Sequence, residues 1–375
     1  MADAPRTILI IGATGIFGTR LSLHLSKTAG LQLVLASRSA AKAKALVATL
    51  TSEGAVAELL PVPLDVTKAL KQSLHHLQPF AVIDCSGPFQ GAGYHAAQAV
   101  IESGAHFIDL ADARDYLAGF PTALNDQAKA NGVTVIAGAS STPSLSGCVV
   151  DELVAGWQSV DNIDIAISPA GRSEVGQAVI EAIMSYVGKP VAVWKDGRLG
   201  EATGWVDRWT MPMPGLGERR VAATETFDAE RLGKRHSVTG RVSFGAGLES
   251  AIEQLGIETM ARLRSRGLLF DPAPLAPWFI RARKLTRVTT GKSGGMVVVV
   301  EGHDGDGNQL RRQWSLLAEH DDGPYVPVMA TAAALRKLLI GNVATGAHLG
   351  ADILELDEIE AEMAPYSITT KIETL

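Results

Sequence analysis

The sequence predicts an α/β protein: an N-terminal domain with a doubly wound parallel sheet, followed by a second α+β domain built on a largely antiparallel sheet. Short aliphatic segments alternate with helical ones from residue 7 to residue 139, which is the order of a doubly wound sheet. All six tryptophans lie beyond residue 150, where the composition changes. A length of 375 residues suits two domains of ordinary size. We therefore expect a first domain over 1–150 and a second, for substrate binding or dimerisation, over 151–375.

The first domain should contain six strands, each a continuous apolar run of the kind found in strands that helices cover on both faces. These runs are 7–12, 31–37, 56–62, 80–86, 105–110 and 133–138. The segments between them are rich in Ala, Leu, Lys and Glu, and each ends near a Gly or Asn that can cap a helix.

The second domain shows one clear hairpin, in which 296–301 and 309–318 flank the turn sequence HDGDGN. A calcium loop is the alternative for this turn, but the spaced ligands and closing Glu of such a loop are missing, so a hairpin tip is favoured. The Pro and Gly spacing of 211–220 predicts a loop. A late helix over 325–340 is a candidate to pack back on the first domain, and the acidic tail after residue 351 is expected to be a solvated edge.

Charge and cysteine content narrow the function classes. With 34 Lys and Arg against 40 Asp and Glu, the formal net charge is -6, which offers no general field for nucleic acid. Two cysteines, Cys85 and Cys148, cannot form a disulfide framework, and the N-terminus lacks the features of a signal peptide. No uninterrupted apolar stretch reaches about 18 residues, the length needed to span a membrane. We expect a soluble, cytoplasmic protein that binds no nucleic acid.

A basic segment lies in the second domain. Residues 258–292 hold eight Lys or Arg against two Asp or Glu, interleaved with the sequence LLFDPAPLAPWFI. A solvated helix and loop is the more frequent explanation of such a segment. The alternatives are a site for an anionic substrate and attachment to an anionic membrane surface. A membrane surface is thus an open partner but not a predicted one.

The first strand runs directly into the sequence GATGIFG and then into a helical segment. A strand, a glycine turn and a helix N-terminus in this order bring backbone N–H groups and the positive end of the helix dipole to a pyrophosphate. This is the Rossmann arrangement of a dinucleotide-binding site. The candidate cofactor-binding residues in it are Gly12, Thr14, Gly15, Ile16, Phe17 and Gly18.

The end of the second strand indicates which dinucleotide binds. A site for NAD usually offers an acid to the ribose hydroxyls, whereas this sequence has Ser37, Arg38 and Ser39. A guanidinium supplies charge and paired donors to a 2′-phosphate, so NADP is favoured over NAD. Asp65 and Val66 follow the third strand and are candidates to border the adenine, although Asp65 is equally suited to cap the next helix.

The turn after the fourth strand is expected to face the nicotinamide, since ligands of open α/β sheets lie beyond the carboxyl ends of the strands. The candidates in this turn are Ser86, Gly87, Pro88 and Phe89. Phe89 is suited either to wall the ring or to pack in the core. Cys85 is interpreted as a core residue, because no basic neighbour would activate its thiol.

No familiar catalytic constellation is present. The sequence lacks the Tyr and Lys four positions apart of the short-chain dehydrogenases, the GxSxG elbow of hydrolases and any metal spacing among its nine histidines. No metal site is predicted, and the catalytic residues are unknown. Weak candidates for a catalytic role are Tyr94, His95 and Thr142, and Asp109 is a further candidate for the proton donor. Thr142, in the turn at 140–146, is expected to line the substrate pocket together with the turn at 87–93.

Several motifs in order resemble the NADP-binding domain of the saccharopine dehydrogenase-like family: GATGIFG, ASRS, IDCSGPFQ, AHFIDLAD and GVTVIAGASSTPSLSG. The resemblance covers roughly residues 5–150, and the later GAHLGADILELDEIE resembles the C-terminal stretch of that family. It implies a Rossmann domain, a second α+β domain and a pyridine-nucleotide oxidoreductase. Saccharopine reductases in this family act with NADP(H) on an imine, whereas trans-acting enoyl reductases reduce a carbon–carbon double bond in lipid synthesis.

Two departures from the family pattern leave the substrate open. Saccharopine reductases carry an Asp-Pro-Gly turn after the sixth strand, where this chain has Thr142, Pro143 and Ser144. Phe89 replaces a tyrosine that is common in the family. The main hypothesis is an NADP(H)-dependent oxidoreductase that passes a hydride between the nicotinamide and an imine or carbonyl of a small molecule. Alternatives are an enoyl reductase on a lipid-like substrate and a non-catalytic NADP-binding sensor, and a homodimer stays open.

Overall fold

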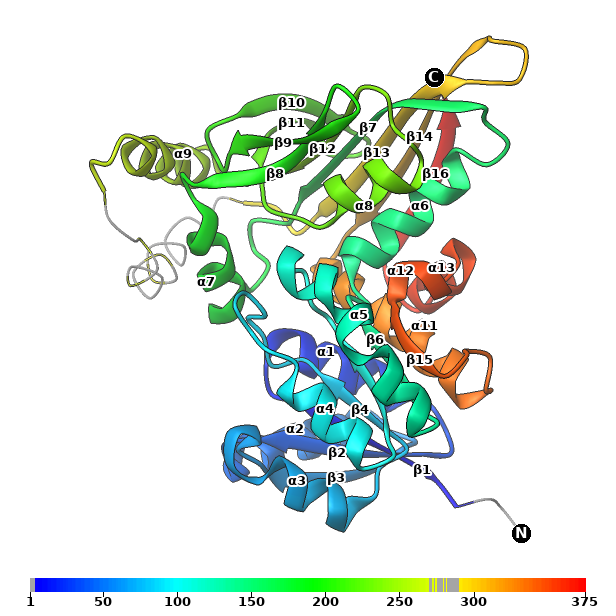
Figure 1. Cartoon of the computed structure of the whole chain (residues 1–375). Coiled ribbons are helices and arrows are strands. Elements are labelled where there is room, and N and C mark those ends of the chain that lie inside the picture. Colours follow the sequence, from blue (N-terminus) through cyan, green and yellow to red (C-terminus); the bar gives the residue numbers. More distant parts are fainter. Residues whose placement is uncertain (1–3, 270–271, 273, 275–278, 280, 282–289) are drawn as a thin grey trace. The chain divides into compact units, whose positions relative to one another are not determined.

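The computed structural model describes residues 4–269, 272, 274, 279, 281 and 290–375 (Figure 1). The chain folds into two compact units. The first consists of Met1–Ser144 and Pro324–Glu362, and the second of Leu145–Gly323 and Met363–Leu375. This division differs from a single cut at residue 150, because a late segment returns to the first unit. No helix in the described part of the chain is long and apolar enough to cross a membrane.

The first unit is built on a seven-stranded parallel sheet with the order β15-β6-β5-β4-β1-β2-β3. Its strands are β1 (Arg6–Ile11), β2 (Leu31–Ser37), β3 (Glu58–Pro63), β4 (Ala81–Asp84), β5 (His106–Asp109), β6 (Thr134–Ala137) and β15 (Gly346–Leu349). The predicted doubly wound sheet and its six strands are confirmed. The seventh strand, β15, was not predicted and extends the sheet beside β6.

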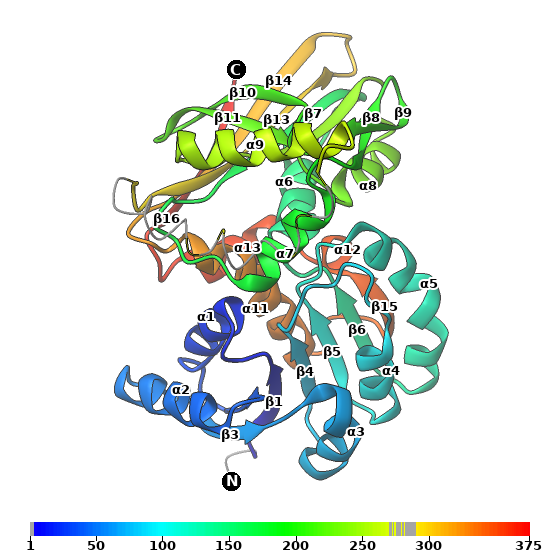
Figure 2. The same cartoon turned by 90° about the vertical axis from the view of Figure 1, so that its left-hand side faces the viewer.

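Helices cover both faces of this sheet (Figure 2). They are α1 (Ile16–Leu25), α2 (Ala40–Ser52), α3 (Val66–Leu77), α4 (His95–Glu102), α5 (Arg114–Ala130), α11 (Val326–Leu339), α12 (Gly350–Ile353) and α13 (Leu356–Met363). The predicted late helix is confirmed as α11, which packs against α1 and β5. The buried hydroxyl of Thr331 on α11 donates a hydrogen bond to the carbonyl of Ala139 at 2.6 Å. These contacts explain why residues 324–362 belong to the first unit.

The acidic tail is a solvated edge only in part. It forms α13 and then β16 (Ile368–Thr374), and Ile359 on α13 is fully buried. The carboxylate of Glu362 pairs with His24 at 2.6 Å and accepts a hydrogen bond from Arg336. Burial raises the pKa of Glu362, but its bonds to His24 and Arg336 outweigh burial and hold this pKa below the usual value. The expectation is wrong for α13, where Glu362 is buried in internal pairs, but β16 is an edge strand of its sheet and its residues are exposed or half-buried.

The second unit is built on a nine-stranded sheet with the order β10-β11-β12-β7-β13-β14-β16, in which β8 lies beside β12 and β9 beside β8. Its other strands are β7 (Ser159–Ser168), β8 (Pro190–Lys195), β9 (Arg198–Thr203), β10 (Arg208–Met213), β11 (Gly217–Ala223), β12 (Arg241–Ala246), β13 (Gly294–His303) and β14 (Gln309–Ala318). Among the described strand pairs of this unit only β7 and β12 run parallel, so the largely antiparallel sheet is confirmed. Its helices are α6 (Ser146–Leu153), α7 (Gln177–Tyr186), α8 (Asp228–Arg235) and α9 (Ala251–Ser265).

The predicted hairpin in the second unit is confirmed as β13 and β14. Asp304 closes its tip, because the carboxylate accepts hydrogen bonds from the backbone N–H groups of Asp306 at 3.0 Å and Asn308 at 2.9 Å. The hydrogen bonds from Asn308 are the main cause that lowers the pKa of Asp304. Asp304 in the HDGDGN sequence thus stabilises the turn of the hairpin.

The predicted loop at 211–220 is wrong. β10 and β11 form an antiparallel hairpin in which Pro212 lies opposite Glu218. β10 is the edge strand of the sheet, and a proline is tolerated there because no further strand needs its missing N–H. Gly215 forms the turn with a φ of 78°, which favours glycine. Proline and glycine mark an edge hairpin here, a pattern that the sequence alone does not separate from a loop.

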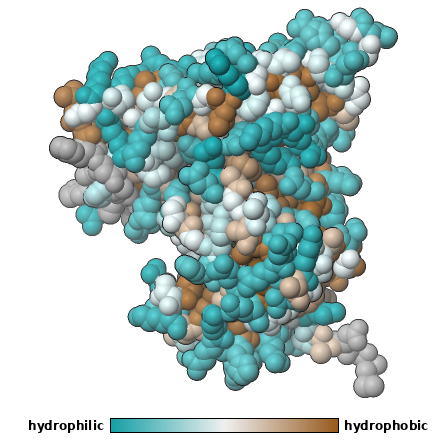
Figure 3. Space-filling model, in the orientation of Figure 1, coloured by the Kyte–Doolittle hydropathy of each residue, from teal (hydrophilic) through white to brown (hydrophobic). Residues whose placement is uncertain are grey.

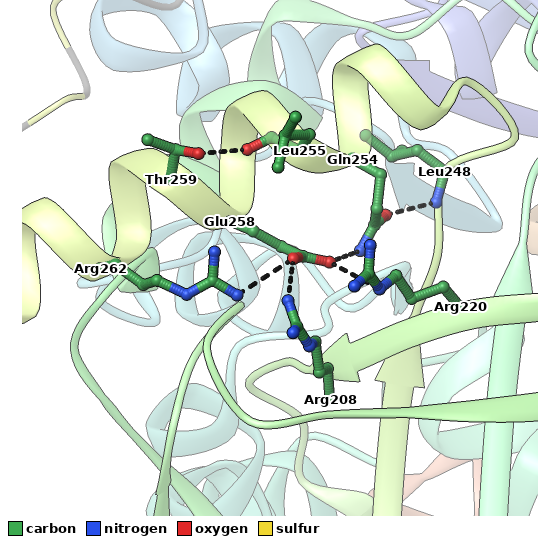
Figure 4. A network of polar contacts seen from close by, with 8 residues as sticks. All are labelled: Arg208, Arg220, Leu248, Gln254, Leu255, Glu258, Thr259 and Arg262. Atoms are coloured by element: carbon green, nitrogen blue, oxygen red, sulfur yellow. Dashed lines mark hydrogen bonds and ion pairs between the residues drawn. The ribbon is translucent and has the colours of Figure 1, made fainter.

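A buried carboxylate ties α9 to this hairpin (Figure 4). Glu258 on α9 accepts hydrogen bonds from Arg208 at 2.7 Å and Arg262 at 3.2 Å, and its other oxygen lies 3.5 Å from Arg220. Gln254 donates to that second oxygen at 2.9 Å. Burial raises the pKa of Glu258, but these partners outweigh burial and lower it. One carboxylate therefore joins the helix to both strands of the hairpin.

Replacing Glu258 with Ala should destabilise the second unit. The change leaves three guanidinium groups and one amide without their shared acceptor, a loss of about 1–3 kcal/mol in the free energy of unfolding. Urea unfolding followed by tryptophan fluorescence measures the loss. Glu152→Ala removes an exposed acid from α6 and serves as the control, which should unfold as the unaltered protein does. Equal unfolding midpoints for Glu258→Ala and the control would contradict the stabilising role of this network.

Candidate cofactor-binding site

The loop between β1 and α1 leaves the N-terminus of α1 open. Gly12 has a φ of 70°, a conformation that favours glycine. Gly15 precedes the helix with φ -77° and ψ 173°, and no side chain caps the helix at this position. Uncapped N–H groups at the positive end of a helix dipole are suited to bind an anion. Ile16 and Phe17, in the first turn of α1, are half-buried.

Gly15 and Gly18 lack side chains for different reasons. A Cβ at Gly18 would lie 2.2 Å from the carbonyl oxygen of Gly12, so this glycine allows α1 to pack against the loop. Gly15 is exposed, and a Cβ there would meet the Gly12 oxygen at 3.2 Å and no other surrounding atom within 4 Å. The missing side chain of Gly15 therefore leaves space beside the helix N-terminus, where a pyrophosphate must approach closely.

The end of β2 presents an exposed cation beside this loop. The hydroxyl oxygens of Thr14 and Ser37 are 2.9 Å apart, which joins the glycine loop to the end of β2. Ser39 caps α2 by accepting the backbone N–H of Lys42 at 3.4 Å. Arg38, between Ser37 and Ser39, is exposed. Within the described residues its side chain forms no ion pair or hydrogen bond. Its guanidinium is available to a ligand, so the residues present fit a dinucleotide with a 2′-phosphate.

Asp65 has a structural role at the start of α3. Its carboxylate accepts hydrogen bonds from the backbone N–H of Thr67 at 3.1 Å and from the Thr67 hydroxyl at 2.7 Å. The hydroxyl bond is the main cause that lowers the pKa of Asp65. This geometry bears out the capping interpretation of Asp65. A contact of Asp65 or Val66 with the adenine stays a prediction.

The turn after β4 is held by the last residue of that strand. The Asp84 carboxylate accepts hydrogen bonds from the backbone N–H of Ser86 at 2.8 Å and from its hydroxyl at 2.6 Å. Phe89 is buried, and its ring centre lies 5.4 Å from that of Tyr116. This contact favours the interpretation that Phe89 packs in the core. Burial above all raises the pKa of the Cys85 thiol, so this cysteine is not an activated nucleophile.

The structure places the proton-donor candidates in different settings. The hydroxyl of Tyr94 donates to the backbone carbonyl of Tyr116 at 2.8 Å, and burial raises the pKa of Tyr94. His95 is exposed at the start of α4, and Thr142 is half-buried with extended backbone angles. Within the described part of the chain no hydrogen bond joins Tyr94, His95 and Thr142. Their catalytic roles, and those of Gly87 and Pro88 in cofactor binding, stay predictions.

An acidic network lies at the carboxyl edge of the first sheet. Asp84 and Asp109 are the last residues of β4 and β5 and lie opposite each other in register. The Asp109 carboxylate accepts hydrogen bonds from the backbone N–H groups of Ala111 at 3.0 Å and Gly138 at 2.8 Å, and from the Tyr116 hydroxyl at 2.8 Å. Burial raises the pKa of Asp109 to about 7. Of these two acids, only Asp109 was a candidate functional residue from the sequence. The signal for Asp84 was an aspartate near the end of each of two adjacent predicted strands.

The basic segment lies partly outside the described residues, including most of LLFDPAPLAPWFI and Trp278. Its described part begins within α9, and on this helix Leu263 in the segment and Ile252 and Leu255 before it are exposed. Figure 3 shows apolar atoms at the surface over this helix. On the same helix Arg264 donates hydrogen bonds to the backbone carbonyls of Met184 and Val187. A role for this segment in binding an anionic substrate or a membrane surface stays a prediction.

Comparison with known proteins agrees with this geometry. Residues 8–136 match the family model described as the saccharopine dehydrogenase NADP-binding domain. The fold is similar to that of saccharopine dehydrogenase (L-Glu forming) from Saccharomyces cerevisiae, with a TM-score of 0.68, 15% identity and 99% and 100% coverage of this chain and that one. It is also similar to DAP dehydrogenase from C. glutamicum and to an engineered D-amino acid dehydrogenase bound to NADP+, each with a TM-score of 0.50, 15% identity and coverage of 96% and 99%. No curated protein matches the chain.

The Rossmann sheet, the open glycine loop and the matched domain define the class: a pyridine-nucleotide oxidoreductase. Within that class, residues 8–136 match the NADP-binding domain of saccharopine dehydrogenase. The resemblance seen in the sequence motifs is therefore confirmed.

Proposed function

We propose that this chain is an NADP(H)-dependent oxidoreductase that transfers a hydride between the nicotinamide and the imine or carbonyl group of a small molecule. The observation that carries the cofactor preference is the exposed Arg38 at the end of β2, where no acid is present for the ribose hydroxyls of NAD. The open N-terminus of α1 would hold the pyrophosphate, and bound NADP(H) would supply or accept the hydride.

The substrate class rests on the turn that follows β6. Thr142 is followed by a proline, in place of the carboxylate of the saccharopine reductase pattern. Its hydroxyl can donate or accept a hydrogen bond, which suits a neutral carbonyl or enoyl group better than a protonated amine. The similar solved structures carry names of dehydrogenases of amino acids and of saccharopine, and these names support placing α-amino and α-keto acids first among the compounds to test.

Two measurements on the full chain test the proposal. Titration with NADPH and NADH, followed by cofactor fluorescence, should show tighter binding of NADPH. Oxidation of bound NADPH should then accelerate with one class in a panel of α-keto acids with amines, simple ketones and enoyl thioesters. Acceleration by enoyl thioesters alone would replace the proposal with enoyl reduction. Tight NADPH binding without oxidation by any class would favour the non-catalytic sensor, and absence of binding would refute all three hypotheses.

A further inference from the structure

Two buried carboxyl groups lie side by side at the edge of the first sheet without a cationic partner. Asp84 and Asp109 occupy matching positions on neighbouring strands, and both are buried. Their described hydrogen-bond donors are neutral: Ser86 for Asp84, and Tyr116 with two backbone N–H groups for Asp109. Within the described residues no Lys, Arg or His forms an ion pair with either acid. A buried carboxylate is expensive unless a cation compensates it.

The proposed cofactor would bring a cation to this edge. In a Rossmann sheet the dinucleotide lies across the carboxyl ends of the strands, with its second half over the strands beyond the switch point between β1 and β4. Asp84 and Asp109 are the last residues of the first two strands on that side. The nicotinamide ring is a pyridinium cation in NADP+ and a neutral dihydropyridine in NADPH. The oxidised and reduced cofactors therefore differ by one positive charge near the two acids.

We propose that the Asp84–Asp109 pair makes the cofactor site discriminate between oxidation states, binding NADP+ more tightly than NADPH when Asp109 is ionised. This inference rests on the proposed function, because it requires a nicotinamide at the carboxyl edge of β4 and β5. Asp109 acts through the field of its charge, and its buried position keeps that field from being screened by water.

The discrimination should depend on pH because burial raises the pKa of Asp109 to about 7. Below that value Asp109 is neutral and offers no attraction, and above it the carboxylate favours the cationic ring. The titratable side chains that interact electrostatically with Asp109 are those of Asp84 at the end of β4, Cys85 directly after β4, and Tyr116 on α5. Tyr94, before α4, also lies within range of the Asp109 charge. The cations of α11 engage acids of α13 instead: Arg336 with Glu362 and Lys337 with Glu358.

The test compares NADP+ and NADPH binding to the full chain at pH 6 and pH 8, by calorimetric titration without substrate. The ratio of the NADPH dissociation constant to that of NADP+ should rise by about tenfold between the two pH values. The 2′-phosphate also titrates near pH 6, but it does so in both cofactors and cancels in the ratio. Binding of NADP+ near pH 7 should release a fraction of a proton, seen as a dependence of the heat on the buffer.

Asp109→Asn keeps the shape and the backbone hydrogen bonds of the side chain and should make the ratio independent of pH. Asp126→Asn removes the same charge from the exposed face of α5 and should behave as the unaltered protein. Tyr116→Phe removes a donor to the carboxylate, which should move the rise in the ratio to higher pH. A rise that persists in Asp109→Asn, or a flat ratio in the unaltered protein that nonetheless binds both cofactors, would overturn this inference alone. Failure to bind either cofactor would overturn the proposed function as well.

Discussion

Replacing Gly15 with Val should severely weaken cofactor binding while the fold survives. The backbone of Gly15 has φ -77° and ψ 173°, a conformation that valine favours, and its Cβ requires only a small shift of the Gly12 oxygen, which would lie 3.2 Å away. Its side chain would fill the space beside the uncapped N-terminus of α1 and keep a pyrophosphate away from the N–H groups. Each lost hydrogen bond to a charged group costs about 1.5–3 kcal/mol, so NADPH binding should weaken by about two orders of magnitude or more. Fluorescence titration measures the loss, and circular dichroism monitors the fold.

Gly18 provides the matched comparison for that variant. A Cβ at Gly18 would lie 2.2 Å from the Gly12 oxygen, so Gly18→Ala should lower the thermal midpoint as well as binding. Gly256→Ala, at an exposed helical position of α9 where a Cβ meets no atom within 4 Å, should leave binding unchanged and raise the thermal midpoint slightly, because alanine favours the helix over glycine. If Gly15→Val binds NADPH as tightly as the unaltered protein, the glycine loop serves the turn and not the cofactor.

Replacing Arg38 with Ala should weaken binding of NADPH by about 10- to 150-fold and leave binding of NADH almost unchanged. The expected loss corresponds to a charge-assisted contact of about 1.5–3 kcal/mol with the 2′-phosphate. The exposed guanidinium has no described protein partner, so its removal should not unfold the unit. Titration of both cofactors against both proteins gives the four dissociation constants needed.

Lys44→Ala is the control for the Arg38 variant, because it removes an exposed cation from the following helix, α2. It should leave the ratio of the NADPH and NADH dissociation constants as it is in the unaltered protein. Equal losses of NADPH and NADH affinity in Arg38→Ala would mean that Arg38 does not read the 2′-phosphate. The preference for NADP would then need another origin in the site.

For several elements the local sequence pattern was sufficient to predict the structure. The apolar runs of β1 to β6 predicted a parallel sheet, since strands covered on both faces must be apolar throughout. GATGIFG predicted an open helix N-terminus because a glycine turn between a strand and a helix has few other geometries. The hairpin of β13 and β14 and the helix α11 were equally evident. Each of these depends on periodicity or turn chemistry within a few residues.

Tertiary structure decided the features that depend on what lies beside a segment. Pro212 marks a strand and not a loop because β10 is at a sheet edge. Glu362 of the acidic tail is buried because His24 and Arg336 pair with it. The strand β15 joins a sheet whose other strands lie far away in sequence. Asp84 and Asp109 become one network only when β4 and β5 pair in register. Register, edge position and charge pairing join residues distant in the chain, and no local pattern in the sequence contains that information.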